Sequence, residues 1–107
     1  MEKEMLLITN CSIIRTMDAL CGKWRLLIIY VLLSGAKRFK DLEQSIDGIN
    51  TKMLVKELKM LEKNKIITRK AYAQVPPRVE YTLTEKGYAL KNIIDEVRLW
   101  DKNYMNV

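Results

Sequence analysis

Apolar residues recur at helical spacing in the first part of the chain. The first such segment has apolar residues three or four positions apart, at Ile13, Ile14, Met17 and Leu20. This spacing predicts an amphipathic helix, which Gly22 can end as a left-handed cap. An almost unbroken apolar run follows at 26–33, closed by Gly35, and its β-branched residues leave a strand open. Its length and the preceding helix favour a buried helix, so we expect two N-terminal helices within 12–36.

Two further amphipathic segments follow within residues 37–64. The first carries its apolar face at Phe39, Leu42 and Ile46. The stretch Asp-Gly-Ile-Asn then predicts a turn, after which Asn50 or Thr51 can cap the next helix. That helix, expected at about 51–64, has a buried stripe at Leu54, Leu58 and Leu61.

The hydrophobic period then changes from helical to alternating. Residues 66–83 read as two strands on either side of a turn that contains Pro76 and Pro77. The prolines are tolerated there because neither has to donate a hydrogen bond to the strand ladder. Thr84 can then cap a final helix at 84–104, which carries one apolar stripe.

The order of these elements is four helices, two strands and a helix. Three helices followed by a hairpin form the core of a winged helix-turn-helix, so the expected fold class is mostly α with a small β-hairpin. The first and last helices are additions to this core at the chain ends. The 107 residues suffice for one such domain over 1–107 with one modest core.

The excess positive charge of the chain lies in its middle. Between Lys37 and Arg78 there are 11 Lys/Arg and 5 Asp/Glu, a net +6, which equals the net charge of the whole chain. A basic region of this kind indicates one basic face and an anionic partner, with nucleic acid the first candidate. A generally basic soluble protein is the alternative.

Four lysines lie on one side of the helix expected at 51–64. At about 100° per residue they fall within about 60° of one another, opposite the leucine stripe; we call Lys52, Lys56, Lys59 and Lys63 the lysine row. Such a row repels itself unless an anion neutralises it, although an ordinary solvated face is the simpler interpretation. Its place in the second helix of a helix-turn-helix favours DNA.

The expected roles of these residues follow from their positions. A helix in a major groove reads bases mainly with its first turns, where the chain has Asn50, Thr51, Lys52, Val55 and Lys56. Lys59 and Lys63 are better placed for phosphates, and Arg38 and Lys40 could hold the flanking DNA backbone. At the hairpin tip, Arg78 could reach a phosphate or a narrow minor groove, assisted by Gln74.

The final helix is longer than its own domain can cover. About 21 residues make a rod of roughly 30 Å. Packing on the same domain explains part of its stripe, and we expect the rest to form a dimer seam with the first helix. The residues assigned to this seam are Ile13, Met17, Leu90, Ile93, Ile94, Val97, Trp100 and Tyr104.

Several other classes of protein are disfavoured. The chain has no histidine, and its cysteines, Cys11 and Cys21, match neither a zinc site nor a CxxC motif. We see no paired carboxylates and no Gly-rich phosphate loop, so we expect no enzyme, no metal and no cofactor. The longest apolar run is far shorter than a membrane span, and the N-terminus has no secretory-signal pattern, so we expect a cytoplasmic protein.

The sequence resembles the HxlR-type group of bacterial winged-helix transcription regulators. The matching stretches are CSIIRTMDALCGKWRLLIIYVLLSGAKRF, DLEQSIDGINTKMLVKELKMLEKNKIITRKAY and VPPRVEYTLTEKGYAL. The most specific motifs are Gly-Lys-Trp at 22–24, Lys-Met-Leu at 52–54 and PPRVEYTLTEKG. The resemblance implies a homodimer, joined by its terminal helices, that binds operator DNA and represses or activates neighbouring genes. It also implies that 51–64 is the recognition helix and 71–81 the wing.

The resemblance also bears on Cys11, because some members of the group sense oxidants or electrophiles through a cysteine at this position. A helix N-terminus and the nearby Arg15 favour the thiolate, although a plain small residue at a helix start is the alternative. Cys21 stands where the group usually has a small residue. Buried packing is the favoured interpretation of Cys21, and a partner for Cys11 of the other subunit is the second.

The sequence is also compatible with two alternatives. A winged helix can also be a protein-protein interaction module without sequence-specific DNA binding. A small-molecule effector near the seam is the other, since six methionines and two tryptophans could line an adaptable pocket. Core packing explains the same residues more often.

Overall fold

The structure is a computed structural model that describes residues 11–105. The N-terminal segment, in which we expected no secretory signal, lies outside the described residues. The chain starts with α2 (Ser12–Leu20) and α3 (Arg25–Leu32), which confirms the two N-terminal helices. The apolar run is a buried helix and not a strand, since three residues of α3 are fully buried: Ile28, Ile29 and Leu32.

The helix-turn-helix consists of α4 (Phe39–Ser45) and α5 (Thr51–Lys63). Asn50 caps α5, because its side-chain oxygen accepts a hydrogen bond of 2.8 Å from the backbone N–H of Met53. The predicted leucine stripe of α5 is buried at every position, at Leu54, Leu58 and Leu61. The same burial places the opposite side of α5 in solvent.

A small antiparallel sheet follows the helix-turn-helix. Its hairpin strands are β2 (Ile67–Tyr72) and β3 (Arg78–Leu83). A third strand, β1 (Lys37–Arg38), pairs with the other edge of β3, so the sheet order is β1-β3-β2. The sequence did not predict β1, since two residues are too few to show a strand period.

The C-terminal segment is not the single helix expected at 84–104, and that prediction is wrong. It divides into α6 (Glu85–Tyr88), α7 (Lys91–Trp100) and a π-helical turn, η2 (Asp101–Met105). The helix tightens between α6 and α7, where the backbone N–H of Leu90 bonds to the carbonyl three residues earlier.

Contacts with the hairpin hold α6 in place. The Thr84 hydroxyl accepts a hydrogen bond from the Gly87 N–H at 3.2 Å, which confirms the predicted cap, and donates one to the Lys65 carbonyl at 2.7 Å. A Cβ on Gly87 would lie 2.4 Å from the Ile66 carbonyl oxygen, so only glycine lets α6 approach this closely. α6 is therefore fixed to the sheet, while α7 leaves in a different direction.

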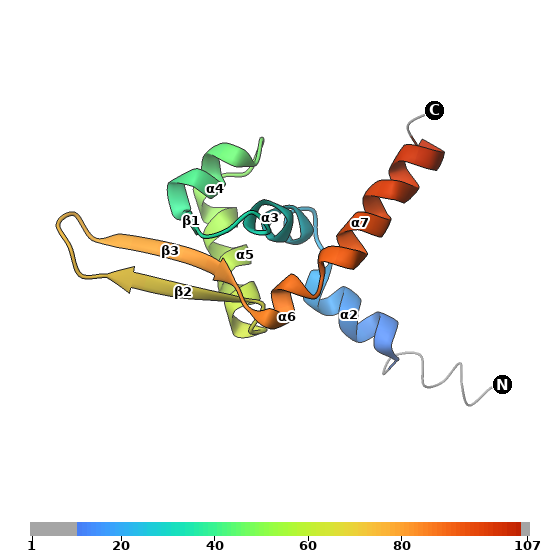
Figure 1. The fold of residues 1–107 in the computed structure, drawn as a ribbon, viewed down its shortest axis with the longest axis horizontal. Coiled ribbons are helices and arrows are strands. Elements are labelled where there is room, and N and C mark those ends of the chain that lie inside the picture. The colour runs from blue at the N-terminus through green and yellow to red at the C-terminus, as the bar shows by residue number, and fades with distance from the viewer. Residues whose placement is uncertain (1–10, 106–107) are drawn as a thin grey trace.

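The helices and the wing occupy different parts of the molecule. Figure 1 shows the β2–β3 hairpin extending from one side of the helical body, while α2 and α7 lie on the opposite side. The core lies between α3, α4, α5 and the base of the sheet. A contact made by the wing is thus spatially separate from one made by α2 and α7.

Candidate DNA interface

The lysine row is exposed along the outer side of α5. Among residues 11–105, no ion pair involves any of its four lysines. Neither carboxylate of α5 forms an ion pair with the row within residues 11–105, because Glu57 is buried and pairs with Arg25, and the exposed Glu62 is in none of the ion pairs there. The row is therefore a line of positive charge whose counter-ions must come from outside the chain.

Two of the polar side chains at the start of α5 already form hydrogen bonds within the chain. The amide oxygen of Asn50 is occupied by the cap, and the hydroxyl of Thr51 donates a hydrogen bond to the carboxylate of Glu43 in α4. Val55 is exposed, as a base-contacting residue has to be. Met53 is also exposed, at 38%, and the sequence analysis did not name it as a residue that could contact DNA. The signal that could have identified it is a long apolar side chain one position beyond Lys52.

Arg38 and Lys40 flank the start of α4, and both side chains are exposed. The backbone N–H of Arg38 donates to Asp41 Oδ2 at 3.1 Å, which fixes the first turn of α4. The two basic side chains thus extend from a firmly held helix start, as a contact to the DNA backbone requires. Their assignment to phosphates stays a prediction.

The wing differs from expectation at Arg78. Its guanidinium lies 4.4 Å from the centre of the Tyr72 ring, and its Nε lies 3.7 Å from Glu80 Oε2. The residue begins β3, beside the tip and not on it, and its side chain is only 30% exposed. Arg78 therefore contacts Tyr72 in the free protein, while Gln74 lies in the exposed loop beyond.

Two further basic residues of the wing were missed. Arg69 and Lys70 are exposed on β2, and the Lys70 ammonium lies 5.1 Å from the Tyr72 ring centre. Two cations, Lys70 and Arg78, thus lie close to the ring of Tyr72. The missed signal was the Arg-Lys pair in a strand that leads to the basic tip.

The predicted seam residues are exposed with two exceptions. Ile94 is 5% exposed and packs into the core of its own chain, so its assignment to the seam is wrong; α7 turns this position toward α3. Leu90 is partly buried against the same core. The other six are exposed by 43% or more: Ile13, Met17, Ile93, Val97, Trp100 and Tyr104.

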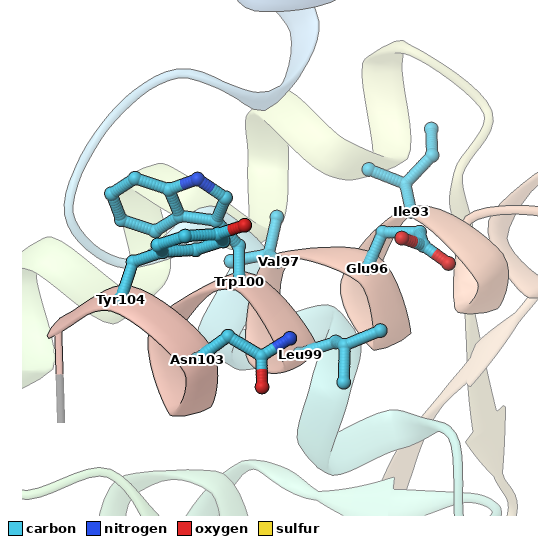
Figure 2. Close-up of a pocket in the computed structure, with 7 residues that line it drawn as sticks. All are labelled: Ile93, Glu96, Val97, Leu99, Trp100, Asn103 and Tyr104. Carbon is cyan, nitrogen blue, oxygen red and sulfur yellow. The ribbon is translucent and has the colours of Figure 1, made fainter. Parts of the chain in front are cut away.

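The exposed side of α7 carries large apolar and aromatic side chains. Figure 2 shows Ile93, Val97, Trp100 and Tyr104 along one side of the helix, beside a shallow hollow. The rings of Trp100 and Tyr104 lie 5.7 Å apart. Every residue that lines the hollow comes from α7 or η2, so no other described segment covers this face.

The two cysteines occupy the two ends of α2. Cys11 is the N-cap residue and is partly exposed. Cys21 follows the last residue of the helix and is exposed, so the expectation of buried packing is wrong. Leu20 takes the buried position instead, and the extended backbone at Cys21 turns its side chain outward.

The chain matches one family of known proteins over most of its length. The HxlR-like helix-turn-helix model matches residues 19–107. The chain belongs to this family. It is therefore a helix-turn-helix transcriptional regulator and not an enzyme, and the winged-helix fold class predicted from the sequence is confirmed.

Individual relatives agree with this assignment. The chain is 44% identical over 93 residues to the HTH-type transcriptional regulator YodB of Bacillus subtilis (strain 168), covering 86% of this chain and 83% of YodB. The solved structure of YtcD superposes with a TM-score of 0.87 at 37% identity, covering 91% and 99% of the two chains. The oxidised form of the redox regulator HypR gives 0.82 at 36%, covering 87% and 96%. Between residues 11 and 105, no helix has the length and apolar character to cross a bilayer.

Proposed function

We propose that the protein binds operator DNA in a sequence-specific manner as a homodimer. The lysine row carries this proposal, because four exposed cations on the outer side of α5 have no partner among the described ion pairs. The first turn of α5 reads base edges, the lysines further along contact phosphates, and the wing adds a second contact beside them. The exposed apolar side of α7, with α2, joins two copies.

Dimerisation sets the form of the operator. Two copies related by a two-fold axis present two recognition helices, so they bind two half-sites about one helical turn apart. Removing the seam therefore weakens operator binding far more than it weakens contact with one half-site. Sedimentation of the free protein, followed by titration with one half-site and with a full site, tests both statements.

A protein-protein interaction module is the alternative function. Neutralising phosphates releases counter-ions, so DNA affinity falls steeply as salt rises, by about 0.9 log units per log unit of salt for each phosphate. A protein partner bound through packed apolar contacts shows a much shallower dependence. If Lys52→Ala with Lys56→Ala leaves DNA affinity unchanged at low salt, α5 is not the reading helix.

We also propose that oxidants act on the protein through Cys11. The partial exposure of Cys11 and the likeness to HypR, a redox regulator with oxidised and reduced structures, support this proposal. Diamide takes two electrons and two protons from a pair of thiols, leaving a disulfide. Because Cys11 and Cys21 lie at opposite ends of α2, about 15 Å apart along the helix, the disulfide joins Cys11 of one subunit to Cys21 of the other. The test is to follow operator binding and non-reducing electrophoresis after diamide or a quinone. Cys11→Ser abolishes both responses, whereas the proposal fails if both persist in that variant.

A further inference from the structure

One buried ion pair joins three helices behind the lysine row. Glu57 is the only charged residue among the buried ones of the described chain. Its Oε2 accepts a hydrogen bond of 2.7 Å from Nε of Arg25, the first residue of α3. The Nη1 atom of the same arginine donates to the carbonyl of Asp18 at 2.9 Å and approaches that of Ala19 at 3.4 Å.

The geometry of this contact is specific to arginine. The carbonyls of Asp18 and Ala19 lie in the last turn of α2, where a helix leaves its carbonyls without partners within the helix. A guanidinium is planar and presents its donors in a fixed fork, so one side chain bonds α2 and α5 at once. Neither helix can shift or rotate against the other without losing one of these bonds.

The position of the pair connects two parts of the proposed function. α5 carries the lysine row on its outer side and Glu57 on its inner side. α2 follows Cys11, its N-cap residue, and carries Ile13 and Met17 of the seam. The Arg25 side chain is hydrogen-bonded to both helices, and it is largely buried at 13% exposure.

We propose that Arg25 is a positioning residue that couples α2 to the recognition helix and sets the angle at which α5 meets DNA. This proposal rests on the proposed function of α5. A change at the N-terminus of α2, or in the packing of α2 against a second subunit, reaches α5 through this side chain. Stability alone is a weak explanation for the pair, because apolar residues of similar volume often stabilise such a site as well or better.

The test separates positioning from stability. In Arg25→Met with Glu57→Met both charges are removed together, so no charge is left buried without a partner. We expect this double variant to melt at or above the wild-type temperature and to sediment as the wild type does. Its preference for operator over unrelated DNA falls about tenfold, the size of effect known for residues that couple two sites. Its salt dependence on unrelated DNA stays unchanged, because the lysine row is intact.

A matched control is the exposed pair of Lys91 and Asp95 on α7, which has the same 2.7 Å separation. Replacing both with methionine leaves the operator preference unchanged. If the double variant at 25 and 57 keeps the wild-type preference, Arg25 is structural only and the proposal is overturned.

A second variant covers the case in which the apolar pair does not fold. Arg25→Lys keeps the charge but cannot reproduce the fork, so it lowers operator preference while retaining most of the stability. A folded Arg25→Lys protein with wild-type preference overturns the proposal. Failure of the proposed function looks different, because the wild type itself then shows no preference for any DNA site.

Discussion

Removing Lys59 and Lys63 gives a prediction with a definite magnitude. Both residues lie in the C-terminal half of the lysine row and are exposed. They are assigned to phosphates and not to bases. A dimer carries two copies of each, so the double alanine variant loses four phosphate contacts. The slope of log K against log salt therefore becomes shallower by about 3.6, from about 0.9 for each contact.

Fluorescence anisotropy with a labelled operator, measured at several salt concentrations between 50 and 200 mM, gives this slope. Over that fourfold range of salt, the affinity of the wild type therefore falls by a factor roughly 100 times larger than the affinity of the variant does. The control is Lys91→Ala with Lys102→Ala, which removes the same charge from α7 and η2. The comparison is valid only if this control variant is still a dimer. An unchanged slope in the Lys59/Lys63 variant, or an equal change in the control, would refute the placement of α5 on DNA.

Three further predictions test other parts of the molecule. Val97→Asp gives a folded monomer in sedimentation, because the aspartate places a charge in the proposed seam at a position that is 52% exposed in one chain. Val75→Asp at the wing tip, 99% exposed and outside the seam, remains a dimer, and a dimeric Val97→Asp protein would exclude the seam. Arg78→Ala weakens operator binding measured by anisotropy without changing fold or dimer, and loss of the dimer would contradict the wing assignment. Gly87→Ala lowers the free energy of unfolding by about 1–3 kcal/mol in urea titration because its Cβ meets the Ile66 carbonyl; an unchanged midpoint would disprove that close contact.

The sequence predicted the elements whose residues contact each other locally. α5 was found because its leucines and lysines repeat at the helical period, and its cap joins Asn50 to a backbone N–H only three residues further along the chain. The hairpin was found because its period is two and its turn contains prolines. In both cases the pattern and the structure depend on the same neighbouring residues.

The features that the sequence did not predict depend on distant parts of the chain. β1 forms only because β3 offers a free edge, and the close approach of α6 to the hairpin depends on Gly87 lying against Ile66. Ile94 looks like part of one exposed stripe until α3 is placed beside it. The Arg25–Glu57 pair joins residues 32 positions apart, and no local pattern marks such a contact.

The account depends most on two recognition helices reading one operator. Selection of binding sites from a random DNA pool by the purified wild-type protein tests this claim directly. We predict an enriched inverted repeat whose half-sites lie about one helical turn, roughly 10 base pairs, apart. Enrichment of a single half-site, or of no sequence, would contradict it.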